Sequence, residues 1–110
     1  MDHDLLVFDM QAKLCQALGH TVRLRIVHAL KEGPRCVNAL VAILKDIPQP
    51  TISRHLAVLR SAGVVSTERQ GMEVIYQIAN PKIVGVCEMM RTILADRELQ
   101  QLYIMQSILA

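Results

Sequence analysis

The sequence has few aromatic residues, no tryptophan and no long apolar run. Aromatic residues make up 3% of the 110 residues although 52% are hydrophobic, so aliphatic side chains must fill the core. No run of 18 apolar residues is present, and acidic residues stand near the N-terminus where a signal peptide would be basic. We therefore expect a cytoplasmic protein that does not enter a membrane.

Cysteine is also scarce. The three cysteines are an odd number without C-x-x-C spacing, which fits a reducing compartment better than a disulfide framework. The four histidines do not form H-E-x-x-H, and the chain has neither a nucleophile motif nor a phosphate-binding glycine loop. We therefore expect that the protein is not an enzyme.

The length predicts a single domain over residues 1–110, and the surplus of aliphatic residues favours a dimer interface. The net charge is only +2, but it is distributed unevenly. Residues 1–20 carry three aspartates and one lysine, a net −2, whereas residues 33–72 carry five basic and two acidic residues, a net +3. A basic middle segment supports binding to nucleic acid, although a solvated charged surface would look similar.

The segment Gln49–Gly63 is the most informative. Its apolar residues Ile52, Leu56 and Leu59 follow one another at helical spacing, which predicts a buried face. The opposite face carries small residues, hydroxyl groups and a central Arg54 instead of the Glu and Lys pairs of a typical surface helix. Such a face suits close approach to base edges in a major groove, which is about 12 Å wide.

The residues after this helix change to strand periodicity. Gly63 predicts a left-handed cap, and strand-forming residues then stand on either side of Arg69–Met72, which predicts a β-hairpin. A short helix over residues 37–44 and a turn over residues 45–48 precede the recognition helix. The fold class is therefore mostly α with a small β-hairpin, a winged helix-turn-helix. The alternative is an ordinary helix and hairpin in a small α+β domain.

Helices are also expected at both ends of the chain. Residues 4–18 place Leu6, Met10, Leu14 and Leu18 on one face, and residues 21–32 form a second helix. Its inward residues are expected to be Val22, Ile26, Ala29 and Leu30. After Asn80 and Pro81 a long helix follows, with an apolar stripe of Ile83, Cys87, Met90 and Leu94. This stripe loses its phase, so the helix either rotates its buried face or breaks near Asp96. We expect these terminal helices to form a homodimer.

Three segments, Leu18–Ile26, Gln49–Gly63 and Arg69–Tyr76, resemble the signature segments of the ArsR/SmtB family. This resemblance implies a dimeric winged-helix repressor of the kind that often senses metals, metalloids or redox-active molecules. The chain departs from the family pattern in its longer turn and in Pro48, which replaces a capping Ser or Thr. The candidate DNA contacts are Gln49, Thr51, Ser53, Arg54, His55, Arg60, Arg69 and Gln70. For His55, a position at the edge of the core is an equal alternative.

The family's sensor sites are incomplete in this sequence. At the positions of its carboxylate and histidine metal site stand Asn80, Lys82, Ile93 and Asp96, of which only Asp96 ligates well. Where other members carry Cys-Val-Cys, this chain has Cys36-Val37-Asn38, and His28 occupies the position of a second-helix sensor cysteine. A thiol sensor for a thiophilic metal or metalloid would use Cys36, with Cys15 as the preferred second ligand and Cys87 as the fallback.

The function expected from these features is a sequence-specific transcriptional repressor. It would bind double-stranded DNA as a homodimer on an inverted-repeat operator and would be released by a small inducer. Two alternatives stay open at this stage. One is a winged helix that binds another protein, and the other is a constitutive DNA-binding regulator whose cysteines sense nothing.

Overall fold

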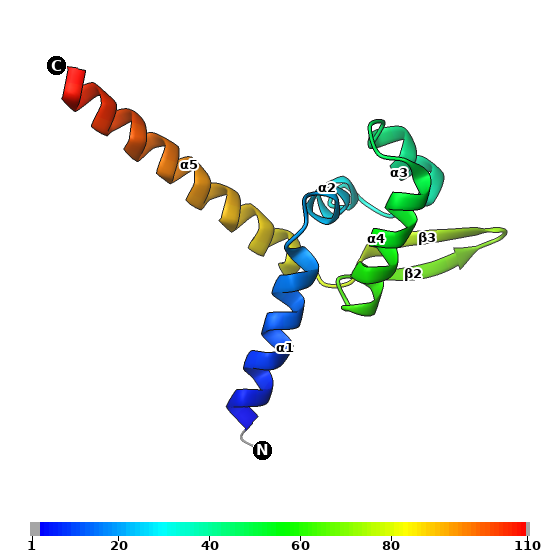
Figure 1. Ribbon diagram of the computed structural model, residues 1–110. Coiled ribbons are helices and arrows are strands. Elements are labelled where there is room, and N and C mark those ends of the chain that lie inside the picture. The colour runs from blue at the N-terminus through cyan, green and yellow to red at the C-terminus, as the bar shows by residue number, and fades with distance from the viewer. Residues whose placement is uncertain (1–2, 110) are drawn as a thin grey trace.

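A computed structural model describes residues 3–109, which form five helices and a three-stranded sheet (Figure 1). The elements are α1 (His3–Leu18), α2 (Thr21–Leu30), β1 (Arg35–Cys36), α3 (Val37–Ile43), α4 (Gln49–Ser61), β2 (Val65–Gln70), β3 (Glu73–Ile78) and α5 (Lys82–Leu109). Helices α2, α3 and α4 and the sheet form the body, from which α1 and α5 extend in different directions. The radius of gyration is 17.6 Å, whereas a compact chain of this length has about 13 Å.

The core lies where α2, α3 and α4 meet the sheet. Ile52, Leu56 and Leu59 have 0% exposed surface, as the spacing on the recognition helix predicted. The residues of α2 expected to face inward are also buried, except Val22, which is partly buried. Aliphatic side chains fill this core, as the scarcity of aromatic residues requires. The largest of them are Ile26, Leu30, Leu40, Ile52, Leu56 and Leu59.

Helix α4 begins without a side-chain cap but is regular from its first residue. Pro48 stands in the N-cap position with extended backbone angles, and its carbonyl oxygen accepts the N–H groups of Thr51 and Ile52, both at 3.1 Å. The missing hydroxyl therefore does not disturb the helix start. Ile47, which is buried, anchors the preceding turn in the core.

Helix α4 ends in a Schellman motif. Gly63 has φ +77°, its N–H donates to the Arg60 carbonyl at 3.1 Å, and the Val64 N–H donates to the Leu59 carbonyl at 2.9 Å. Val64 and Leu59 are both fully buried, which supplies the hydrophobic contact that accompanies this motif. The predicted left-handed cap is confirmed.

The sheet has the strand order β1-β3-β2, with all pairs antiparallel. The hairpin pairs Gln70 with Glu73 across a two-residue turn, in which Gly71 has φ +62°. Arg69 and Gln70, expected between the strands, instead complete β2. Strand β1 was not predicted, because two residues are too few to show a period of two.

The terminal helices leave most of their apolar side chains exposed in the protomer. Helix α5 is uninterrupted, so the expected alternative of a break near Asp96 is wrong. On α1, only Leu18 of the predicted apolar stripe is buried, and Leu6, Met10 and Leu14 are exposed, which leaves them available for the expected dimer interface. On α5, Ile83 is buried and Cys87 is partly buried, whereas the later residues of the stripe are exposed. Helices α2 and α3 end slightly earlier than expected, at Leu30 and Ile43.

Over residues 3–109, no helix combines the length and the apolar character needed to span a membrane. This holds for α5 as well, the longest helix at 28 residues.

The cap of α4 provides a test of the fold. Gly63→Ala should lower the free energy of unfolding by about 1–2 kcal/mol, because a Cβ atom is strained at positive φ even where the site is open. Gly85→Ala is the matched control. No atom lies within 4 Å of its added Cβ and it stands inside α5, so it should be neutral or stabilising. Urea unfolding at one fixed protein concentration compares them, and equal stability of the two variants would contradict the strained cap.

Candidate nucleic-acid interface

Helix α4 holds one face in the core and presents the other to solvent. The buried stripe of Ile52, Leu56 and Leu59 fixes the rotation of the helix about its axis. On the outer face Arg54 is exposed between small residues such as Ala57, and α4 contains no acidic residue. The outer surface is therefore a positively charged ridge with little side-chain bulk.

The structure brings most of the predicted contact residues to exposed positions on two adjoining elements. Gln49, Ser53, Arg54 and Arg60 are exposed on α4, and Thr51 is partly buried near its start. Arg69 and Gln70 are exposed at the end of β2, next to the hairpin turn. Figure 1 shows this hairpin extending past α4 to a free tip. A helix and an adjacent wing that carries Arg69 and Gln70 are thus available to one partner.

His55 lies on the other side of α4. Its side chain is only 7% exposed and stacks on His20, with ring centroids 4.3 Å apart and planes inclined by 41°. We therefore leave His55 out of the proposed DNA contacts, and its role as a core-edge residue is the one that the structure supports. His20, which sequence reasoning missed, also caps α2, because its Nδ1 accepts the Val22 N–H at 3.1 Å.

The His55 ring is held in a setting that disfavours a positive charge. Burial lowers its pKa below the usual value, and the neighbouring His20, Arg23 and Arg54 lower it further. Its Nδ1 is buried and has no hydrogen-bond partner among residues 3–109. The neutral imidazole is therefore part of the contact that joins α4 to the start of α2.

The turn before α4 is fastened to α2 by an ion pair. Arg25 donates from Nη1 to Asp46 Oδ2 at 2.8 Å and from Nη2 to Oδ1 at 2.7 Å. These hydrogen bonds lower the pKa of Asp46 to about 2. The side chains are 40% and 67% exposed, so the pair adds little stability. Its two parallel hydrogen bonds instead fix the position of the turn relative to α2.

The three cysteines lie on different elements and do not form a metal centre within the protomer. Cys15 is exposed on α1, and Cys36 and Cys87 are partly buried. Burial, and to a smaller extent Glu88, raises the pKa of the Cys87 thiol, which suits a structural cysteine. Over residues 3–109, no group of three or more His, Cys, Asp or Glu side chains could hold a metal ion.

Cys36 directly precedes α3, and the neighbouring Arg35 is directed to another partner. Neighbouring residues of a strand point to opposite faces, and Arg35 Nε donates to the Ala29 carbonyl oxygen at 3.0 Å. A thiol sensor based on Cys36 with Cys15 from a partner subunit stays a prediction.

The pair α3 and α4, its connecting turn and the following hairpin define a winged helix-turn-helix domain. A sequence model of the bacterial regulatory protein arsR family matches residues 20–67. The chain belongs to this family, as its signature segments predicted.

Similar proteins agree with this assignment. The chain is 46% identical over 74 residues to the HTH-type transcriptional repressor SmtB of Mycobacterium tuberculosis, covering 67% of this chain and 54% of SmtB. It thus spans about half the length of that relative. It is 35% identical over 96 residues to the transcriptional repressor PagR of Bacillus anthracis, covering 84% of this chain and 95% of PagR.

Solved structures show the same fold. The crystal structure of PagR matches with a TM-score of 0.71 at 34% identity, covering 78% of this chain and 98% of that chain. The homodimeric winged helix-turn-helix DNA-binding domain of Mb0332 from Mycobacterium bovis, a possible ArsR-family regulator, matches with a TM-score of 0.76 at 29% identity. That match covers 92% of each chain.

Buried His55 predicts an acid-sensitive fold. Its pKa is lower in the folded than in the unfolded protein, so below about pH 6.5 the unfolded chain binds the proton more readily. The free energy of unfolding should fall as the pH drops through this range, and His55→Gln should remove that part of the decrease. Urea unfolding between pH 5 and 8 measures it. His3→Gln, exposed on α1, is the control that should retain the wild-type slope. An unchanged slope in His55→Gln would refute the assignment.

Proposed function

We propose that this protein is a homodimeric transcriptional repressor that binds a specific DNA sequence through α4 and the β2–β3 hairpin. The observation that carries the proposal is the outer face of α4, where Arg54 stands exposed among small residues without an acidic neighbour on the helix. The buried face of α4 also supports the proposal. Because its apolar stripe is completely enclosed, the helix holds its outer side chains in a fixed direction.

In the proposed complex, α4 lies in the major groove. Gln49, Ser53 and Arg54 can donate hydrogen bonds to base edges, and Arg is the side chain that most often reads guanine. Arg60 lies at the C-terminal end of the helix and would contact phosphate, as would Arg69 from the hairpin. Small residues such as Ala57 let the helix backbone approach the bases closely.

The names of similar proteins favour repression over activation. SmtB and PagR are both named transcriptional repressors, and PagR aligns over nearly its whole length.

The terminal helices support a homodimer. Helix α1 exposes Phe8 (65%) and Met10 (62%), and α5 exposes a continuous stripe of Val86, Met89 and Ile93. A single protomer leaves this apolar surface uncovered, which is typical of a protein interface. The Mb0332 domain is described as homodimeric. In a two-fold dimer the two α4 helices would lie one turn of DNA apart and read an inverted repeat.

Arg54→Ala tests the DNA interface. It should weaken specific binding by about 1–3 kcal/mol, roughly 5- to 150-fold, because a charged donor to a base edge is lost. Binding to an operator selected from random DNA is measured by fluorescence anisotropy at several salt concentrations. Arg97→Ala is the matched control, because Arg97 is exposed on α5 and is not a proposed DNA contact. This variant should bind like the wild type. Wild-type affinity in Arg54→Ala would remove this residue from the interface. Failure to select any operator, together with a stable protein partner, would favour an interaction module.

A second experiment tests the dimer. Sedimentation equilibrium at micromolar concentration should give twice the protomer mass, and Ile93→Glu should shift the protein toward monomer by placing a charge within the apolar stripe of α5. Met72→Glu is the control. Met72 is 94% exposed at the hairpin tip, so the same charge there should leave the dimer intact. A wild-type monomer at this concentration would contradict the proposal.

A further inference from the structure

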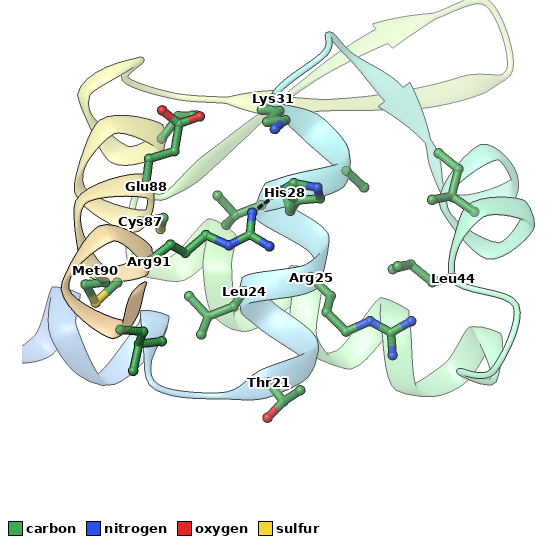
Figure 2. Close-up of a pocket in the computed structure, with 15 residues that line it drawn as sticks. Thr21, Leu24, Arg25, His28, Lys31, Leu44, Cys87, Glu88, Met90 and Arg91 are labelled. Atoms are coloured by element: carbon green, nitrogen blue, oxygen red, sulfur yellow. Dashed lines mark hydrogen bonds between the residues drawn. The ribbon is translucent and has the colours of Figure 1, made fainter. Parts of the chain in front are cut away.

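A cavity of about 610 Å³ lies between α2 and α5 and extends to the end of α3 (Figure 2). Its walls are mostly apolar, with Leu24 and Val27 from α2, Leu44 after α3, and Met90 and Leu94 from α5. The volume is within the range of small-molecule sites, which is roughly 300–1,000 Å³. The DNA-binding surface does not use this cavity, because none of the proposed DNA contacts lines it.

The polar groups of the cavity are mainly cationic. Figure 2 shows Arg91 reaching from α5 to His28 on α2, and Arg91 Nη1 is 3.2 Å from His28 Nδ1. A guanidinium group only donates hydrogen bonds, so His28 Nδ1 is the acceptor in this contact. Lys31 and Arg25 also line the cavity, and Glu88 is the only acidic residue to do so.

The charge of Arg91 is not neutralised by a carboxylate. Within the part of the chain that the structure describes, neither Arg91 nor Lys31 forms an ion pair, whereas Arg25 is paired with Asp46. A cation in the cavity would meet two uncompensated positive charges and one negative charge. A carboxylate could instead accept two hydrogen bonds from the Arg91 guanidinium, while the apolar walls enclose its hydrocarbon part.

We propose that this cavity binds a small organic carboxylate with an aliphatic or aromatic body, and that this ligand is the effector of the repressor. The inference rests on the proposed function for its regulatory role, but the binding itself does not depend on DNA. Arg91 is the residue that recognises the carboxylate, and Lys31 adds positive potential at the same site.

Residues in the wall of the cavity connect it to the DNA-binding surface. Arg25 lines the cavity, and its guanidinium holds Asp46 in the turn that leads to α4. Leu44, which also lines the cavity, is buried at the start of the same turn. A ligand that spreads α2 from the end of α3 therefore strains the Arg25–Asp46 pair and shifts the start of α4. Coupling between two such sites is typically about 5- to 150-fold in affinity.

Binding is tested on the full-length protein with two matched pairs, decanoate against decanamide and 4-phenylbutyrate against 4-phenylbutanamide, by isothermal titration calorimetry. At least one carboxylate should bind about tenfold or more tightly than its amide, because the amide lacks the charge that Arg91 recognises. Arg91→Met should remove this preference while leaving the affinity for the amide unchanged. Arg97→Met, which is also on α5 but does not line the cavity, should behave like the wild type.

The regulatory step is measured as the ratio of operator affinities without and with saturating carboxylate. This ratio should lie between about 5 and 150 for the wild type and fall toward one in Asp46→Asn, which lacks the charged partner of Arg25. A ratio of one in the wild type would show that the ligand is not an effector.

Two results would overturn the binding site itself. One is equal affinity for acid and amide, and the other is no binding of either carboxylate below about 1 mM, as expected if a second copy of the chain closes the cavity. Operator binding without any ligand tests the proposed function separately. A protein that binds its operator but no carboxylate keeps that function and loses this inference, whereas one that binds carboxylates but no DNA shows the opposite.

Discussion

The rest of the structure depends on the burial of one face of α4. Ile52, Leu56 and Leu59 are completely enclosed, and any rotation of the helix would expose apolar surface at a cost of about 25 cal/mol per Å². The outer face is therefore presented in one orientation, with Arg54 at its centre. The Schellman motif at Gly63 then turns the chain into β2, which sets the wing beside the helix.

Two further contacts join α4 to α2, and each acts at a different place. The His20–His55 contact lies beneath the helix, where burial lowers the pKa of His55 and so disfavours a positive charge. The Arg25–Asp46 pair holds the turn before the helix from the solvent side. The His20–His55 contact belongs to the core, and we expect it to stay unchanged near neutral pH. The second is an exposed contact of low net energy, so a modest force from the neighbouring cavity is enough to alter it.

The protomer is incomplete in the region of its terminal helices. Apolar residues of α1 and α5 remain exposed, and the radius of gyration exceeds that of a compact chain. A dimer explains both features, and it also gives α5 a second role. This helix forms one wall of the cavity through Met90 and Leu94 and carries an exposed apolar stripe. A ligand in the proposed carboxylate site would therefore lie beside the surface that we propose joins the two protomers.

The sequence by itself determined the helices, the hairpin, the buried stripe of α4 and the family, because local periodicity and turn chemistry set these features. Only the tertiary structure placed His55 in the core, since a residue at the edge of a helical face can lie on either side. It also decided the pairing of the short strand β1, the continuity of α5 past Asp96, the Arg25–Asp46 pair and the cavity. Most of these features bring together residues that are distant in the chain, and local sequence patterns do not show which distant side chains meet.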